Sequence, residues 1–219
     1  MGLAFIPEII ALFKIIAKKS GGRPVNLINT KGNLYMFFTA IIILLIVLLY
    51  DINYLNYQKP IAYDEIESIE LSDFKAIKRP NFNLFGSTQF AYICTDIKTQ
   101  FDHNKVSITA FFHPSRSYTF SSELASEGLL NHELGHFHIT ELWKRKIVKA
   151  IIEKGSVSKK EIKSIIKSFL IEERAMQKQY DEETFHGYVL GKQKEWEENI
   201  LSQINKLDNY SNRDIALNN

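Results

Sequence analysis

A run of about 17 residues without a charge, LYMFFTAIIILLIVLLY at 34–50, separates this chain into two parts. At about 1.5 Å per residue, a helix over this run reaches roughly 26 Å, the lower limit for crossing a bilayer. Isoleucine and leucine fall on every face of such a helix, so it has no polar side to expose to water. The run therefore predicts a transmembrane anchor over 34–50, and a buried core helix is the alternative.

The charges on either side of this run predict an orientation. The twenty residues after it contain only Lys59, whereas five basic residues precede it: Lys14, Lys18, Lys19, Arg23 and Lys31. The positive-inside rule then places the N-terminus in the cytoplasm. No small-residue cleavage site follows the run, so we expect the anchor to be retained. The pattern predicts a single-pass cell-membrane protein with a cytoplasmic segment over 1–33, in which an interfacial helix could form, a linker over 51–67, and a periplasmic or extracellular remainder.

Composition excludes several classes of protein. A chain of 219 residues with 45% hydrophobic and 24% charged residues has room for one folded domain and an appendage. The net charge of +2 and the lack of a basic cluster interleaved with aromatics argue against a nucleic-acid partner. The single cysteine, Cys94, rules out a disulfide within the chain and a cysteine-based zinc site. No pattern indicates an oligomeric state.

The part after residue 60 changes from a strand pattern to a helix pattern. The segments 89–101 and 105–112 are rich in β-branched and aromatic residues, and a turn-forming trio separates them, which predicts a hairpin. We expect another strand around 66–77, and we expect the strand that ends at Phe112 to be an edge that can pair with an extended peptide. Apolar residues at helical spacing then predict helices from about 130 to 154, from 158 to 186, and from 192 to 207. The fold class is α+β, with the main domain over 68–207 and a flexible tail over 208–219.

The sequence His132-Glu133-Leu134-Gly135-His136 carries the strongest chemical signal. On a helix, histidines four residues apart lie on one face, so both imidazoles can reach one zinc ion (Zn2+) at about 2.0–2.1 Å. Glu133 is rotated about 100° from His132, which places it near the metal as a general base for a water molecule. The motif predicts a zinc site on a helix, with Glu133 as the catalytic residue.

A catalytic zinc site requires a third protein ligand. His138 and Glu141 are close in sequence but face away from His136 on a helix. The stretch Tyr180-Asp-Glu-Glu-Thr-Phe-His-Gly187 is the richest source of donors. We expect His186 as the third ligand and Asp181 as the next candidate, with either Glu172 or Glu173 as a further alternative.

Two stretches of this chain resemble a family of bacterial predicted secreted zinc-dependent proteases, catalogued as a domain of unknown function in the HExxH metallopeptidase group. The stretch 129–141, LLNHELGHFHITE, is similar to the family's HEQGHFDI helix followed by a glutamate, and 180–187 is similar to its YDxxTxHG motif. The resemblance covers roughly 68–201. It implies a zincin-like metallopeptidase fold and a zinc peptidase role for His132, Glu133 and His136.

The chain departs from the family pattern at two positions: His138 stands where the family usually has Asp, and Leu134 replaces its Gln. The function predicted from the residues and the resemblance is a membrane-anchored zinc-dependent metallopeptidase that hydrolyses a peptide or protein substrate outside the cytoplasmic membrane. The alternative is a non-catalytic, membrane-anchored envelope binding module in which the metal is structural or absent.

Overall fold

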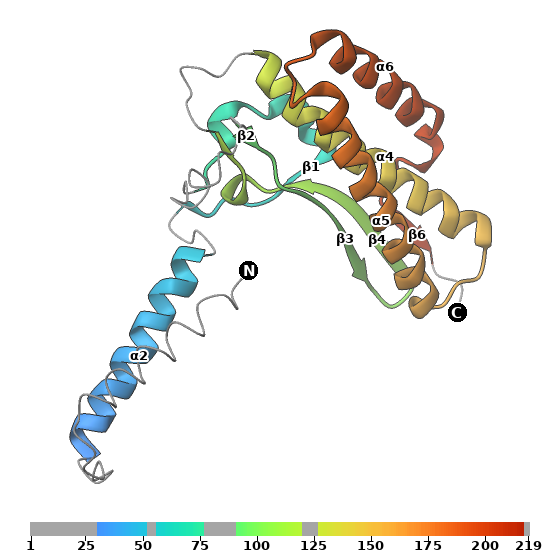
Figure 1. Cartoon of the computed structure of the whole chain (residues 1–219). Coiled ribbons are helices and arrows are strands. Elements are labelled where there is room, and N and C mark those ends of the chain that lie inside the picture. Colours follow the sequence, from blue (N-terminus) through green and yellow to red (C-terminus); the bar gives the residue numbers. More distant parts are fainter. Residues whose placement is uncertain (1–29, 52–55, 77–90, 120–126, 217–219) are drawn as a thin grey trace. The chain divides into compact units, whose positions relative to one another are not determined.

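The computed structural model describes residues 30–51, 56–76, 91–119 and 127–216 (Figure 1). The chain divides into two compact units, Met1–Leu48 and Leu49–Asn219. The described part of the second unit is a mixed α+β fold, as predicted from the change of periodicity along the sequence.

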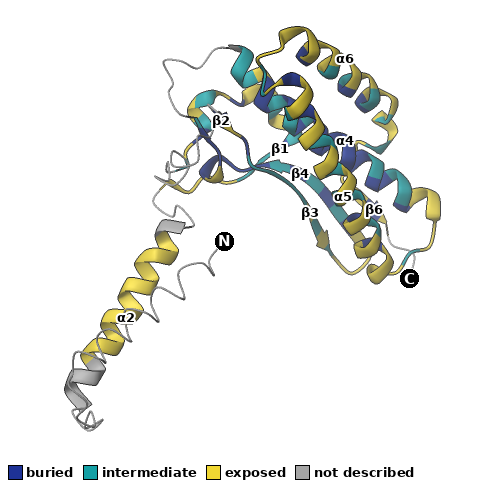
Figure 2. Cartoon of the chain, in the orientation of Figure 1, coloured by how far each residue is buried: buried dark blue, intermediate teal, exposed yellow. Residues whose placement is uncertain are grey.

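The apolar run lies in helix α2 (Thr30–Asp51), and its side chains at 35–49 are exposed (Figure 2). Within the described ranges, none of the helices is both long enough and apolar enough to cross a membrane. This finding contradicts the predicted anchor over 34–50, the membrane as a partner, and the single-pass localisation with a periplasmic or extracellular domain.

The larger sheet has β4 (Lys105–Phe112) at its centre. One side of β4 pairs antiparallel with β3 (Thr95–Phe101), in the register Thr95↔Phe112 to Phe101↔Val106, and this pair is the predicted hairpin. The other side pairs with β1 (Ile61–Ala62) and β6 (Asp214–Ala216). The prediction that the strand ending at Phe112 is an edge is therefore wrong. Two short strands, β2 (Ala91–Tyr92) and β5 (Tyr118–Thr119), form a second sheet.

The strand expected around 66–77 is replaced by turns of 3-10 helix, at η2 (Tyr63–Ser68) and η3 (Leu71–Asp73). Short polar side chains cause this, because Asp73 accepts from the Glu70 backbone N–H and so closes a local turn. Two further 3-10 turns are η4 (Pro114–Arg116) and η5 (Asp208–Tyr210). The tail that we expected to be flexible contains η5 and β6, and Ile215 of β6 is buried.

Three helices follow the sheet: α4 (Glu127–Lys154), α5 (Lys159–Thr184) and α6 (Leu190–Lys206). Helix α4 lies between β4 on one side and α5 and α6 on the other (Figure 1). Its residues are buried on several faces, so it contributes to all three apolar clusters of the unit. A capping box begins α5, where the Ser158 side chain accepts from the Glu161 backbone N–H.

Charged side chains are also buried along α4. The Glu141 carboxylate accepts from Arg145 at 2.8 Å and from Lys144 at 3.3 Å. Arg145 donates in addition to the Ile204 carbonyl, and Lys144 donates to the Ser211 carbonyl. This network therefore attaches the end of α6 and the segment after it to α4.

Candidate metal centre

The first turns of α4 place His132 and His136 on the side that faces α5, and they place Glu133 next to Ile93 in the segment after β2. His132 is 2% exposed and Glu133 is 4% exposed, although both carry polar side chains. Buried polar groups are normally hydrogen-bonded or bind a metal, so their position requires partners from other elements. These partners come from α5 and from the segment after β2.

The end of α5 and the turn after it contribute the opposing side chains. Asp181 lies in the last turns of α5, and the helix ends at Thr184. Phe185 and His186 then adopt left-handed backbone conformations with φ of 48° and 55°, and Gly187 follows with φ of 85°. This sequence of positive φ angles reverses the chain, so that His186 turns back toward Asp181.

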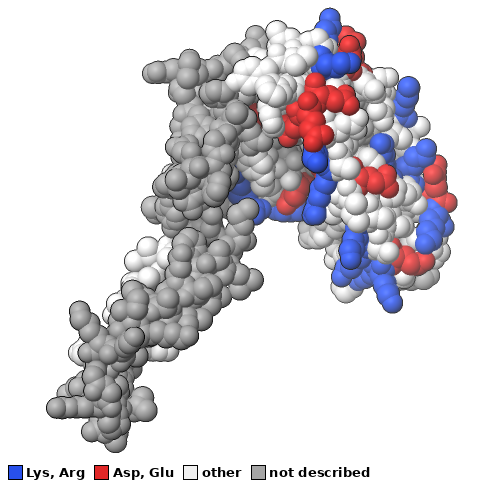
Figure 3. Space-filling view, in the orientation of Figure 1, with Lys and Arg blue, Asp and Glu red and all other residues white. Residues whose placement is uncertain are grey.

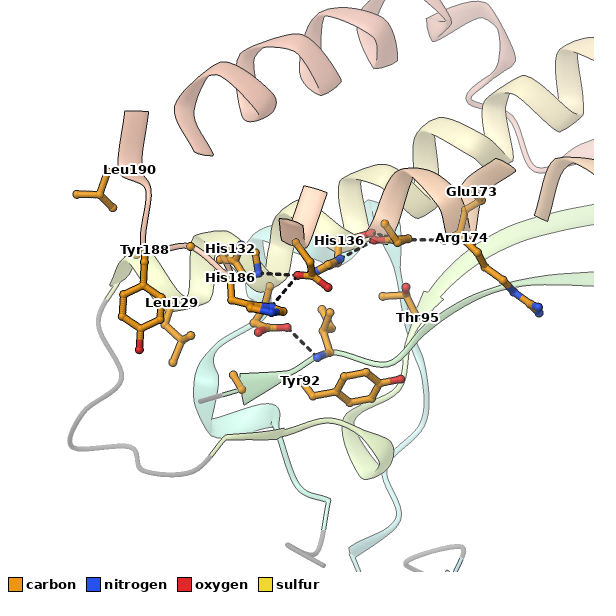
Figure 4. Close-up of a pocket in the computed structure, with 17 residues that line it drawn as sticks. Tyr92, Thr95, Leu129, His132, His136, Glu173, Arg174, His186, Tyr188 and Leu190 are labelled. Atoms are coloured by element: carbon orange, nitrogen blue, oxygen red, sulfur yellow. Dashed lines mark hydrogen bonds and ion pairs between the residues drawn. The ribbon is translucent and has the colours of Figure 1, made fainter. Parts of the chain in front are cut away.

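Three imidazole nitrogens converge on one carboxylate oxygen (Figure 4). Asp181 Oδ1 lies 3.3 Å from His132 Nε2, 3.0 Å from His136 Nε2 and 3.2 Å from His186 Nδ1. Donor atoms of His132, Asp181 and His186 all lie within 4.8 Å of one another, so these residues form a possible metal-binding triad. Donors bound to one zinc ion at 2.0–2.1 Å in a tetrahedron are about 3.3 Å apart, and the three distances from Asp181 Oδ1 to the imidazole nitrogens are close to this value.

The charge states of these groups differ. Burial is the main cause that lowers the pKa of His132, and it favours the neutral imidazole that binds metals. Burial alone would lower the pKa of His136, but the hydrogen bond with Asp181 and the charge of Glu133 outweigh burial and raise it. Burial would raise the pKa of Asp181, yet its hydrogen bonds with His132 and His136 hold that pKa well below its usual range. The cluster therefore keeps Asp181 ionised.

Glu133 lies beside the cluster without taking part in it. Its Oε2 accepts from the Ile93 backbone N–H at 2.8 Å, which fixes the carboxylate between α4 and the segment after β2. Burial raises the pKa of Glu133 to about 7, so the carboxyl group can exchange a proton near neutral pH.

A polar network on α5 orients His136, and the sequence reasoning missed it. His136 Nδ1–H donates to Gln177 Oε1 at 2.5 Å, and Gln177 Nε2 donates to Glu173 Oε1 at 2.7 Å and to the His136 carbonyl at 3.0 Å. Gln177 Nε2 also donates to Thr140 Oγ1. Because oxygen acceptors surround this atom, it is the nitrogen of the amide, and the amide oxygen faces His136 Nδ1. His136 Nε2 is left facing Asp181. The spacing 173, 177, 181 places these residues on one face of α5, which was the available signal.

The remaining candidates have other positions. Glu173 lines the site, but its carboxylate is bonded to Gln177, and Glu172 is outside the cavity. His138 lies away from the cluster, as expected, and its Nδ1 is 2.6 Å from the Tyr63 hydroxyl. Tyr180 is buried, with its ring stacked on His132 at 4.8 Å between centroids. Its hydroxyl donates to the His132 carbonyl.

Residues 121–187 match a bacterial family of unknown function. The family is described as "Bacterial protein of unknown function (DUF922)", and the match includes both stretches on which the resemblance to zinc-dependent proteases was based. None of the curated proteins and none of the solved structures matched this chain.

The cluster lines one wall of a cavity of about 790 Å³ that lies between α4, α5 and the segment around β2 (Figure 4). Cavities of this size accommodate small molecules or several residues of a peptide. His132, Glu133, His136, Asp181 and His186 all line it. A ligand that enters this cavity therefore meets the histidines, Asp181 and Glu133 together.

Proposed function

We propose that this protein is a zinc-dependent hydrolase of peptide bonds. The observation that carries the proposal is the convergence of His132, His136 and His186 on Asp181 Oδ1, beside the buried Glu133 carboxyl group. Imidazole nitrogens and a carboxylate oxygen are donors that zinc binds in proteins, and each imidazole nitrogen lies 3.0–3.3 Å from Asp181 Oδ1. We expect His132, His136 and His186 to hold the metal, with Asp181 as a further donor.

A zinc ion bound there would polarise the scissile carbonyl group and lower the pKa of a water molecule. Glu133 takes up the proton that this water loses as its oxygen bonds to the carbonyl carbon. When the carbon–nitrogen bond breaks, Glu133 gives the same proton to the leaving amine. The Ile93 N–H holds one Glu133 oxygen, and this leaves the other for the proton.

The test measures metal content and hydrolysis separately in the full chain. We expect about one equivalent of zinc by elemental analysis of protein that has never met a chelator, and cleavage of a mixed peptide library detected by mass spectrometry. Glu133→Gln should retain zinc and lose at least 100-fold in cleavage rate, because the amide cannot accept the proton. Zinc below about a tenth of an equivalent in the wild-type protein would contradict the proposal.

A non-catalytic metal site is the second candidate, and one observation favours it. Three histidines and Asp181 together offer four donors, which would fill a tetrahedral ion and leave no position for water, as in structural sites. In that case the wild-type chain binds zinc but cleaves no peptide in the library, and Glu133→Gln behaves like the wild type.

A further inference from the structure

The two ends of the cavity differ in chemistry, and the histidine cluster lies between them. In Figure 4, Leu129, Tyr188 and Leu190 lie at one end, and Arg174 lies at the other. A peptide that passes over the cluster would therefore meet different side chains before and after it. The two ends would therefore select different residues on the two sides of the cleaved peptide bond.

The end near His186 is apolar and open to solvent. The turn between α5 and α6, together with the first residue of α6, exposes four large apolar side chains, Phe185, Tyr188, Val189 and Leu190, the last of them 70% exposed. The rings of Phe185 and Tyr188 are 6.1 Å apart. Clustered apolar side chains at the rim of a cavity are typical of a surface that a ligand covers. This end is suited to an apolar side chain.

The opposite end is cationic. Arg174 is the one lysine or arginine among the described residues that line the cavity. Burial raises the pKa of the Glu173 carboxyl group beside it, and the charge of Arg174 is among the causes that act against this rise. The neighbouring Glu173 carboxylate is engaged by the Gln177 amide. Arginine binds carboxylates with two parallel hydrogen bonds, so this end is suited to an acidic side chain.

The positive charge continues beyond the cavity. Arg174 also lines a groove of about 510 Å³ between β3 and α5, together with Lys163 and Lys167, and the described lining of this groove contains no acidic residue. Figure 3 shows basic side chains gathered over the end of α5 at which this helix begins. An acidic segment that leaves the cavity past Arg174 would enter this groove.

We propose that the site takes an extended peptide that has an apolar residue on one side of the central bond and aspartate or glutamate on the other. This inference rests on the proposed function, since it takes a peptide as the ligand. Arg174 and Leu190 are the residues that set the preference. They bind the flanking side chains and do not touch the reacting atoms.

Binding tests the preference without relying on catalysis. In the full chain with Glu133→Gln, loaded with zinc, fluorescence anisotropy measures the affinity for labelled ten-residue peptides. Two of these peptides contain leucines in one half and glutamates in the other half, and they differ in which half comes first. For each of them, a glutamine version and a lysine version replace the glutamates. We expect one of the two glutamate orders to bind about tenfold tighter than its glutamine version at low ionic strength.

Substitutions at Arg174 and Leu190 test the cationic end and the apolar end of the cavity separately. Adding Arg174→Glu should reverse the preference from the glutamate to the lysine peptide, and a merely structural role for Arg174 would not produce a reversal. The matched control is Lys178→Glu, the same charge change one turn along α5 at a side chain that is 77% exposed and outside the cavity. Leu190→Ser should weaken every leucine-containing peptide, whereas Ile152→Ser, at an exposed position of α4, should not.

The outcomes separate this inference from the proposed function. Equal affinities for glutamate and glutamine peptides, binding of none of them, or an unchanged preference in Arg174→Glu would each overturn the inference, even if the wild-type chain cleaves peptides. A charge preference that Arg174→Glu reverses, in a chain whose wild-type form hydrolyses no peptide, would support the recognition surface and refute the hydrolase. Circular dichroism of each variant checks that it is folded.

Discussion

The orientation of His136 depends on a single side chain of α5. Gln177 accepts the Nδ1 proton of this histidine, and Glu173 and the His136 carbonyl hold the amide in place. Loss of the partner that orients a metal-binding histidine typically weakens metal affinity about 10- to 100-fold. We expect Gln177→Leu to weaken zinc binding by this factor, as measured by competition with a chromophoric chelator.

The comparison variants for this prediction are on the same helix. Gln177→Glu keeps an oxygen acceptor for His136 Nδ1–H and should retain more of the affinity than Gln177→Leu. Gln179→Leu makes the same change at an exposed position whose amide donates to Glu183, and it should bind zinc like the wild type. Equal affinity in Gln177→Leu and the wild type would show that the network does not orient the metal site.

Gly135 between the two motif histidines allows Tyr180 to approach α4. A Cβ atom at Gly135 would lie 2.3 Å from the Tyr180 hydroxyl oxygen and 2.7 Å from Cζ, and the buried ring cannot move without disturbing its stacking on His132. Forcing extra atoms into a packed core costs about 1–3 kcal/mol. We expect Gly135→Ala to lower the free energy of unfolding by this amount in urea titrations.

The matched control is Gly191→Ala, since a Cβ there meets no atom within 4 Å. Within α6 this change should be neutral or stabilise the fold by up to about 1 kcal/mol. If both alanine variants unfold at the same urea concentration, Tyr180 does not constrain Gly135.

At the scale of elements, the start of α5 carries a capping box at some distance from the site. Hydrogen bonds from the Ser158 N–H and hydroxyl, and the nearby Lys154, lower the pKa of Glu161 to about 2. This folded-state pKa is below the ordinary value of 4.5, so the contribution of Glu161 to stability is present above about pH 4.5 and is lost as the pH falls toward 2.

We expect Ser158→Ala to cost about 1 kcal/mol in the free energy of unfolding at pH 7, because the Glu161 N–H loses its cap. Glu161→Gln should also destabilise the fold at pH 7, and its difference from the wild type should shrink when urea unfolding is repeated between pH 4.5 and 3. Zinc affinity should stay unchanged in both variants. A difference that grows on acidification would contradict the assigned pKa.

The sequence predicts elements well where one local pattern decides them. The β3–β4 hairpin follows from two β-rich segments and a short polar turn, and α5 follows from its capping box and periodicity. The prediction of a strand around 66–77 is wrong, because its apolar residues indicate a strand whereas side-chain bonds such as that between Asp73 and the Glu70 N–H close local turns. The central position of β4 depends on β6, a strand about 100 residues away, and no local pattern reports this pairing.

In the candidate site too, local sequence patterns do not report contacts between distant segments. Helical spacing brings His132 and His136 together, and His186 and Asp181 were chosen because donors are dense near residue 180. Their convergence on one oxygen depends on how α5 packs against α4 and on the left-handed turn at 185–187. The roles of Gln177 and Tyr180 depend on the same packing, and therefore single-residue patterns did not indicate them.

At the scale of the whole molecule, a metal would connect two helices that are distant in sequence. His132 and His136 lie on α4, and Asp181 and His186 lie on α5 and its following turn. The unfolded chain does not hold these donors together, so zinc should stabilise the folded form. At a free zinc concentration 100 times its Kd this contribution is about 2.7 kcal/mol.

We therefore expect zinc to raise the Tm of chelator-treated protein by about 5–10 °C in differential scanning calorimetry. Magnesium, which prefers oxygen ligands, should have no such effect. His186→Ala should show a smaller shift with zinc. An identical Tm with and without zinc in the wild type would indicate that the four donors do not bind the metal in the folded state.

The consecutive left-handed residues after α5 limit the thermal stability that this protein can reach while it keeps its affinity for zinc. Two side chains other than glycine, Phe185 and His186, sit in a conformation that costs of order 1 kcal/mol or more each. Glycine at 185 would remove that cost, so selection of random variants for heat resistance should recover Phe185→Gly or Phe185→Asn. The same change would let His186 sample more orientations, and such survivors should hold zinc more weakly than their parent.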